Sequence, residues 1–451
     1  MKAWGALALI ALATATALPA RADPPPPAPE PTPKKQVPDY DGRGPEPKTP
    51  GDAALWVPRV ILSPLYLVTE YVIREPLSVA IPAAERADLP RKVYNFFTFG
   101  PEHKAGIVPV GFIDFDFNPS VGVYAFWRDA FAKGNDWSVH TEAWPMNWYA
   151  LSFKESTRLQ DNLVLQFHLS GVHRPDRVFY GLGPRSLQSN QSRFTEAVTE
   201  ESAMLDWKYL RASRVQLEMG LRSVSLGPGY FGEDPSLERE AATGAFALPD
   251  GFGSRYTAEV NRLLASYDSR KPWPSPGSGA RVELQAEQGS QMQSSPGSGW
   301  VRYGAAASGF LDLDQHQRVV SLSMATAFAD PLGNGPIPFT ELVSLGGDGP
   351  MRAFFPRRMI DRSAASAALH YVWPIGPWLG GNIEAAVGNV FGEHLQGFSP
   401  NLLRFSGDVG ITTVGVSDYP IEALVGIGSE TFEHGGQIDS IRITVSVNHG
   451  F

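Results

Sequence analysis

The chain has 451 residues, with 47 acidic and 38 basic side chains, a net charge of −9 and no cysteine. An acidic chain lacks the basic surface that nucleic-acid binding needs, so we expect no nucleic-acid partner. The lack of cysteine excludes disulfides, thiolate nucleophiles and cysteine-ligated metals.

The first residues are typical of an export signal. Residues 1–22, "MKAWGALALIALATATALPARA", combine an early lysine, a short apolar run and a small-x-small end. This pattern predicts a signal peptide cleaved after Ala22. The alternative is an N-terminal membrane anchor, but the apolar run is short for one. Residues 23–51 are rich in proline and predict an extended periplasmic linker.

Residues 52–100 are dense in apolar and aromatic side chains, interrupted by prolines at positions 58, 64, 76, 82 and 90. Proline restricts helices to short pieces. We therefore predict two or three short amphipathic helices. They would lie either on a membrane face or as a packed cap over the mouth of the following domain.

From residue 101 onward the apolar residues alternate with a period of two, which indicates strands with two different faces. The last such run, "DSIRITVSVNHGF", places Ile441, Ile443 and Val445 on one face and Arg442 and Thr444 on the other. No apolar run of about 20 residues follows the signal peptide. The alternation therefore favours a transmembrane antiparallel β-barrel, an all-β fold, over residues 101–451.

The number and length of these runs support a closed barrel. Sixteen is an even number, as bacterial barrels require, and about 10 to 14 residues suit a tilted strand that crosses a bilayer. A soluble β-sandwich or propeller is the alternative, but it would have to bury the apolar face of every strand. The predicted strands are 104–118, 120–130, 136–146, 147–157, 162–174, 193–209, 213–225, 255–268, 280–290, 299–311, 316–328, 363–374, 379–389, 403–416, 421–429 and 438–451.

One long connection has an unusual composition. Residues 346–363, "GGDGPMRAFFPRRMIDRS", begin with Gly346 and Gly347 and place Arg352 and Phe354 among apolar neighbours. An enzyme loop, an anion-binding nest and an internal plug are three possible interpretations. If the segment lies in a narrow lumen, its guanidinium needs a carboxylate partner, because an unpaired buried charge is costly.

Signals for catalysis are weak. The sequence has no His-Glu-x-x-His, no Gly-x-Ser-x-Gly and no Gly-Lys-Ser/Thr phosphate loop. His168 and Ser170 share one face of a predicted strand, which leaves an outer-membrane lipid hydrolase as a remote alternative. We expect no enzyme activity, no cofactor and no metal site.

Several local patterns resemble the bacterial surface antigen superfamily, the BamA and TamA-like barrels. They are "FYGLGPRS" at 179–186, "YDSRKPWPSPGSGARVELQAE" at 267–287, "SLGGDGPMRAFFPRRMIDRSAASAALHYVWPI" at 344–375 and "GNVF" at 388–391. The likeness covers about residues 104 to 451 and includes no recognisable POTRA domain. It implies a barrel in the outer membrane of a Gram-negative bacterium that assembles or inserts outer-membrane proteins or translocates polypeptides. The alternative is a plugged or passive pore without insertase activity.

The resemblance also implies partners for the protein. Outer-membrane lipid would surround the barrel, and unfolded outer-membrane or secreted polypeptides would be its clients. The barrel assembly machinery would insert the protein itself. In this family a terminal aromatic residue, here Phe451, resembles the signal for that insertion.

For residues 346–363 the resemblance implies a loop that folds into the lumen, with Arg352 paired to an acid on the wall. The sequence departs from the family here, since Ala353 replaces a glycine, His370 stands where a glutamate is usual and Ala386 stands where an aspartate is usual. Glu384 shares a strand face with Ala386, so we predict Glu384 as the partner of Arg352, with Asp361 second and His370 beside them. A solvated, unpaired Arg352 is the alternative.

Overall fold

The computed structural model describes residues 88–144, 147–210, 212–270, 277–292, 298–313, 317–376, 379–413 and 421–447. The predicted signal peptide, the proline-rich linker, residues 52–87 and Phe451 lie outside the described residues.

The described chain starts with a short helix. α6 (Leu89–Phe97) has proline in its first turn, where a missing N–H costs nothing, and ends at the extended residue Thr98. The Thr98 hydroxyl donates to the Tyr94 carbonyl over 2.6 Å. β1 (Thr98–Phe99) and the 3-10 turn η2 (Pro101–His103) follow. No helix in the described part of the chain is long and apolar enough to cross a membrane.

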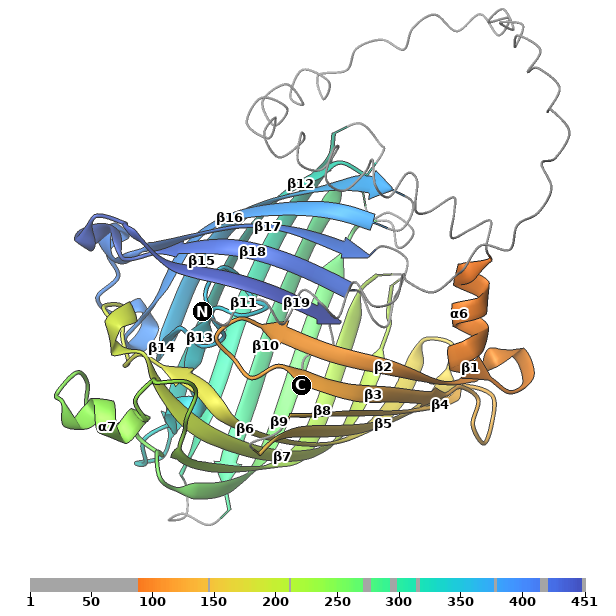
Figure 1. The fold of residues 1–451 in the computed structure, drawn as a ribbon, viewed down its shortest axis with the longest axis horizontal. Helices are drawn as coiled ribbons and strands as arrows, with labels where there is room; N and C mark the ends of the chain where they lie inside the picture. Colours follow the sequence, from red (N-terminus) through yellow and green to blue (C-terminus); the bar gives the residue numbers. More distant parts are fainter. Residues whose placement is uncertain are drawn as a thin grey trace, which may run out of the picture. The chain divides into compact units, whose positions relative to one another are not determined.

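Sixteen strands form one closed antiparallel barrel, in which each strand pairs with the next and β19 pairs with β2 (Figure 1). β1 adds a short pairing to the start of β2. The prediction of a sixteen-stranded barrel is confirmed, and each predicted run contains a strand. The strands are β2 (Ala105–Asp114), β3 (Ser120–Trp127), β4 (Asn135–Trp144), β5 (Trp148–Gln160), β6 (Leu163–Phe179), β7 (Ser192–Trp207), β8 (Arg214–Pro228), β9 (Arg255–Asp268), β10 (Gly279–Gln291), β11 (Gly299–Asp312), β12 (Val319–Leu332), β15 (Ser363–Gly376), β16 (Leu379–Phe391), β17 (Arg404–Thr413), β18 (Ile421–Ser429) and β19 (Ile438–Val447).

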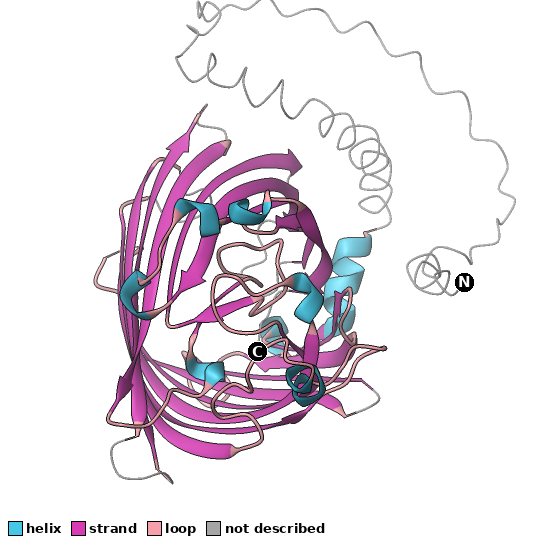
Figure 2. Cartoon of the chain, turned by 90° about the vertical axis from the view of Figure 1, so that its left-hand side faces the viewer, coloured by secondary structure: helices cyan, strands magenta, loops and turns pink. Residues whose placement is uncertain are grey.

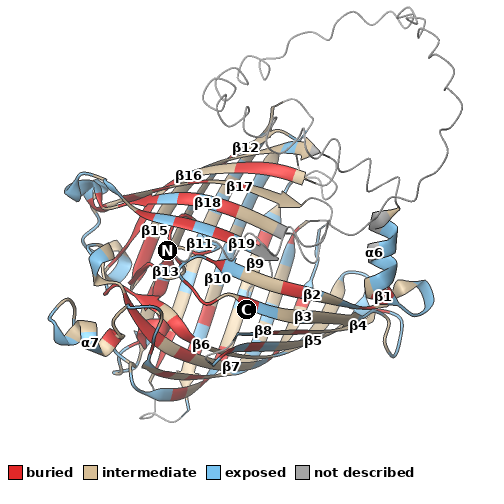
Figure 3. Ribbon diagram, in the orientation of Figure 1, coloured by how far each residue is buried: buried red, intermediate tan, exposed pale blue. Residues whose placement is uncertain are grey.

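The outer surface of the barrel is apolar. On β6, Phe167 and Leu169 are 48% and 50% exposed, while the intervening His168 is more buried. The same alternation runs along the other strands, so buried and exposed residues interleave along each ribbon (Figure 3). A soluble protein would cover such a surface, whereas a bilayer solvates it.

The two ends of the barrel differ. The four longest connections, 180–191, 229–254, 333–362 and 392–403, all lie at one end, here called the loop end. Short helices and loops crowd this opening (Figure 2). The elements in these connections are η3 (Gln188–Asn190), α7 (Leu237–Ala242), η4 (Phe339–Glu341), β13 (Val343–Leu345), β14 (Met359–Asp361), η5 (Glu393–Leu395) and η6 (Pro400–Leu402), with η7 (Phe432–His434) in the last loop.

A hydrophobic core lies inside the barrel, toward the loop end. Residues of segment 333–362 pack there against the inner faces of the strands. Trp300 on β11 and Phe194 on β7 are fully buried, as are Phe339 and Phe354 of the long connection. The lumen is therefore filled over this stretch by the protein's own loop, and this loop organises the candidate site.

We expect the outer face of β6 to be intolerant of charge. Replacing Leu169 with lysine near the middle of the strand should lower the free energy of unfolding by about 2–4 kcal/mol, because the charge would enter hydrocarbon. Urea titration of the protein in lipid vesicles measures this effect. The matched control is Ser170→Lys, which faces the lumen opposite Glu200 and should cost much less. Equal losses in the two variants would contradict the assignment of the faces.

Candidate functional site: the inward loop and the strand seam

Segment 333–362, here called the inward loop, is a hairpin inside the barrel. After η4, β13 pairs with β14 through Val343–Asp361, Ser344–Ile360 and Leu345–Met359. The hydrophobic side chains of this small sheet join the core of the barrel. Residues 346–358 form the tip, which contains most of the motif singled out in the sequence.

Two glycines make the turn into the tip possible. Gly346 and Gly347 have φ angles of +104° and +85°, which side chains rarely tolerate. A Cβ on Gly346 would lie 2.3 Å from the Phe355 carbonyl oxygen. Ala353 replaces the glycine of the family motif without a positive φ, because the left-handed conformation falls on Met351, with φ of +71°.

The entrance of the loop is fastened to the wall formed by β7 to β11. Glu341 is 2% exposed. It accepts hydrogen bonds from Arg222 over 2.7 Å and from the Tyr256 hydroxyl over 2.6 Å. Glu341 belongs to a network of four carboxylates and three guanidiniums, in which each guanidinium contacts at least two carboxylates. Its members are Glu200, Glu218, Glu287, Glu341, Arg222, Arg262 and Arg302.

The tip rests on β17 and β18, where glycines leave space for it. A Cβ on Gly426 would lie 2.7 Å from the Ala353 Cβ, and one on Gly428 would lie 2.4 Å from the Phe354 ring. The Ala353 N–H donates to the Ser406 hydroxyl over 3.1 Å. Small residues on the inner wall therefore form a seat for the tip.

Arg352 forms its ion pair with Glu422 on β18. This finding corrects the sequence prediction, since neither Glu384 nor Asp361 pairs with Arg352. Glu384 lies on the neighbouring wall of β16, directly opposite His370 of β15. Asp361 lies in β14, where its carboxylate accepts from the Arg362 N–H over 2.7 Å, and burial raises the pKa of this group. The arginine is paired and not simply solvated.

A second arginine joins the loop to the first and last strands. Arg442 of β19 is 2% exposed and contacts Asp114 of β2 over 3.0 Å. Its remaining donors reach the carbonyl oxygens of Gly347 and Arg352 over 2.9 and 3.0 Å. One guanidinium thus connects three separate parts of the chain.

Within the part of the chain that the structure describes, the junction between β19 and β2, here called the seam, is the shortest pairing of the barrel. Among the described residues, which end at Val447, the two strands pair at three positions: Thr444–Asp114, Val445–Ile113 and Ser446–Phe112. The other neighbouring barrel strands share at least seven such pairs. One further backbone hydrogen bond extends the seam: the Phe115 N–H donates to the Ile443 carbonyl oxygen over 3.1 Å.

Comparison with protein-family models gives a match over residues 133–396, more than half of the chain, to the Omp85 superfamily domain. The chain belongs to the Omp85 superfamily. A search of curated proteins finds no match. The resemblance to the surface antigen superfamily drawn from the sequence agrees with this assignment.

Comparison with solved structures finds one with a similar fold and others with weaker similarity. BamA from Haemophilus ducreyi lacking POTRA domains 1–3 is similar with a TM-score of 0.54 and 12% identity, over 76% of this chain and 70% of that one. CdiB from Acinetobacter baumannii has a TM-score of 0.48 and 9% identity over 76% and 60% of the two chains. CdiB from Escherichia coli has 0.48 and 12% over 77% and 63%. The chain thus spans less than two thirds of the CdiB structures.

The residues that the sequence prediction missed in this Omp85 barrel are Glu422, Arg442 and Asp114. Each is a charged residue at an inward position of an otherwise alternating strand. That pattern was a usable signal, because a charge on an inner wall needs a partner. The choice of partner depends on strand register, which the alternation does not specify.

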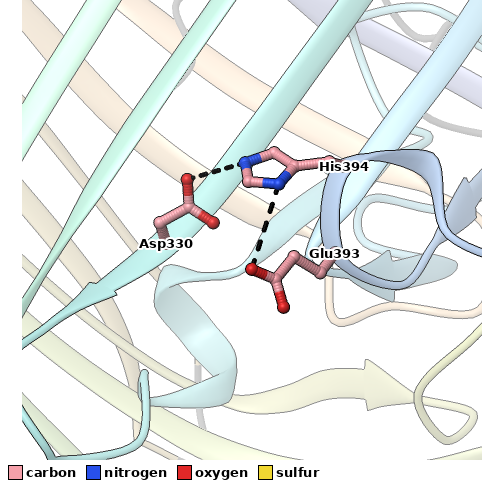
Figure 4. A group of neighbouring side chains, drawn as sticks. All are labelled: Asp330, Glu393 and His394. Carbon is pink, nitrogen blue, oxygen red and sulfur yellow. Dashed lines mark hydrogen bonds and ion pairs between the residues drawn. The ribbon is translucent and has the colours of Figure 1, made fainter.

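A separate group of ionisable residues lies at the loop end (Figure 4). The His394 ring is 3.0 Å from Asp330 and 3.9 Å from Glu393. The Arg362 guanidinium contacts each of these carboxylates over 3.0 Å. The carboxylate charges are therefore already opposed by an arginine, and the group fastens the 392–403 connection to β12 as an ion-pair network.

The pair considered for catalysis does not form a catalytic arrangement. His168 and Ser170 both lie on β6, and the structure places no hydrogen bond between them. His168 instead neighbours Lys154 and Ser202 on the adjoining strands.

The pairing of Arg352 is testable by a double-mutant cycle. Arg352→Met and Glu422→Gln should show a coupling energy of about 0.5–3 kcal/mol in chemical unfolding, because the two groups are partners. The control cycle combines Arg352→Met with Asp361→Asn and should be additive within about 0.5 kcal/mol. Coupling to Asp361 but not to Glu422 would contradict the observed pairing and favour Asp361, the second of the two partners predicted from the sequence.

Removing the Arg442 guanidinium should be more damaging. Arg442→Met leaves Asp114 buried without its partner, and we expect a loss of about 3–5 kcal/mol in the free energy of unfolding. Arg281→Met on β10 is the control, since its ion pair with Glu283 is largely exposed and should contribute little. Similar stabilities of the two variants would show that the Arg442 contacts are not important.

Proposed function

We propose that this Omp85 barrel acts on polypeptides at the outer membrane, either inserting outer-membrane proteins or translocating secreted chains. The clients would be unfolded outer-membrane or secreted polypeptides, and the loop end would face the cell exterior. The barrel assembly machinery would insert the protein into the membrane of a Gram-negative cell. The seam is the observation that carries this proposal.

The seam provides backbone groups for a client. Among the described residues, Ile438 to Arg442 of β19 lie beyond the part of the strand that pairs with β2. Their N–H and C=O groups on that side form a strand edge, and a strand edge is a template for an added strand. Among the described residues, opening the seam would break three residue pairs and the Arg442–Asp114 ion pair, and it would lengthen the edge to which a client strand could add.

The filled lumen argues against a passive diffusion pore, the alternative function. The inward loop packs a hydrophobic core inside the barrel and is fastened to two walls. A pore needs an open aqueous path, whereas a barrel that exchanges strands laterally does not. The loop also contacts Arg442 at the seam, so a change at the seam would alter a contact of the loop inside the lumen.

A disulfide across the seam tests this proposal. Ile113 and Val445 are directly paired, face outward and are partly exposed, and the native chain has no cysteine to interfere. We expect the double variant Ile113→Cys/Val445→Cys, once oxidised, to lose client insertion in a reconstituted lipid-vesicle assay and to regain it on reduction. The readout is the protease-resistant fraction of an added unfolded barrel protein.

A matched control separates closure of the seam from tethering in general. Val425→Cys/Ile443→Cys bridges β18 and β19 at a paired position on the same outer face. Oxidation of this variant should leave insertion unchanged. If the oxidised seam variant remains as active as its reduced form, the proposed role of the seam is wrong.

A further inference from the structure

Under the tip of the inward loop, three ionisable side chains form a row on neighbouring strands. His370 of β15 lies directly opposite Glu384 of β16, and Glu384 lies directly opposite Asp408 of β17. Asn382 lies two residues before Glu384 and so shares its face. The row therefore presents two carboxylates, an amide and an imidazole to one region of the inner wall.

These groups are buried without protein partners. Asp408 is 5% exposed, and neither of its carboxylate oxygens has a hydrogen-bond partner. The same holds for Oε1 of Glu384, Oδ1 of Asn382 and Nε2 of His370. Buried polar atoms nearly always have a partner, and an unpaired buried carboxylate is costly. These four oxygen acceptors without hydrogen-bond partners lie on adjacent strands and favour a group of positive charge beside them.

The nearby arginines are already engaged. Arg352 pairs with Glu422, and Arg442 pairs with Asp114. Arg352 attracts the carboxylates of Glu384 and Asp408 from a distance. Neither of these acids has an ion-pair partner of its own among the described residues, because Arg352 and Arg442 form their ion pairs elsewhere. The tip lies close to Asp408. A Cβ built on Gly426 would lie 2.7 Å from the Cβ of Ala353 in the tip and 3.2 Å from the Cβ of Asp408.

A glycine lies on the wall beside these acids. Gly410 lies opposite Asn382, and a Cβ there would lie 3.0 Å from the Asn382 Oδ1. The glycine keeps this carbonyl oxygen unobstructed. A bulkier residue at position 410 would press on the amide and close the space in front of it.

We propose that Asp408, Glu384 and Asn382 bind a partly hydrated divalent cation of the Ca²⁺ and Mg²⁺ class. Carboxylate and amide oxygens are the ligands of these hard cations, and their combined charge of −2 matches the ion. Among the described residues, His370, Glu384 and Asp408 do not form a group whose three ligand atoms all lie within 4.8 Å of one another. Water molecules therefore complete the shell, as is usual for these ions. His370 borders the site.

The cation would connect β16 to β17 directly below the tip. It would thus stabilise the seat on which Ala353 and Phe354 rest. The loop-end group of Asp330, Glu393 and His394 differs, because there Arg362 already supplies the positive charge. The inference does not depend on the proposed function, since the site would bind its ion in a barrel of any activity.

The test uses the full chain refolded in detergent, free of lipopolysaccharide, and stripped with EDTA. We expect added Ca²⁺ to raise the unfolding temperature of the wild type by several degrees, because the ion binds only the folded state. Equilibrium dialysis with ⁴⁵Ca should give one ion per chain, and Mg²⁺ should compete. Asp408→Asn, which keeps the shape of the side chain, should lose at least tenfold in affinity. In EDTA this variant should unfold at a higher temperature than the wild type, since it removes an unpaired charge.

Asp330→Asn is the control and should bind like the wild type. If Asp408→Asn does not refold, Glu384→Gln serves the same measurement with the same expected loss. The inference is overturned if the wild type shows no stoichiometric Ca²⁺ or Mg²⁺ binding. It is also overturned if binding persists unchanged in both variants of the inner wall, or is lost in Asp330→Asn.

Discussion

The buried guanidinium of Arg442 is the interaction on which the seam and the loop both depend. A guanidinium has five donors in a fixed plane and cannot lose its charge, so its burial requires several acceptors. Here these come from Asp114 on the first strand and from the Gly347 and Arg352 carbonyl groups of the loop. Separating the first and last strands would leave a buried charge unpaired, and this cost opposes opening in addition to the three residue pairs that the described residues form at the seam.

The inward loop is held on both sides of the barrel. Its entrance joins a network of seven charged residues that crosses five strands, in which Glu287 contacts all three guanidiniums. Its tip contacts Glu422, Ser406 and Arg442. At the end of the tip, Arg357 donates to Glu196 of β7 and Arg358 donates to Ser186. Networks whose members share several partners are difficult to disrupt one contact at a time. The part of the tip around Arg352 is the part that contacts the seam.

The sixteen strands were predictable because alternation is a local property of each strand, independent of what the strand contacts. The inward position of Arg352 was also inferred correctly, on a family resemblance. Its partner was not, because Arg352 and Glu422 are 70 residues apart and meet only through the register of β18 under the loop. Glu384 and Asp361 were reasonable candidates because both are acids, and Glu384 lies on the inward face of its predicted strand. The choice among inward acids requires the three-dimensional position of the tip.

Arg352 pairs with Glu422 and not with the predicted partner Glu384, and this difference explains why the inner wall contains acids without a partner. Once Arg352 turns to Glu422, the carboxylates of Glu384 and Asp408 face the lumen with no guanidinium of their own. Two adjacent carboxylates repel each other, and burial under the loop strengthens that repulsion by excluding water. Such a pair persists only if something offsets its charge. Arg352 and Arg442 form their ion pairs with other carboxylates, and the proposed hydrated divalent cation would offset the remaining charge without moving the tip from its seat.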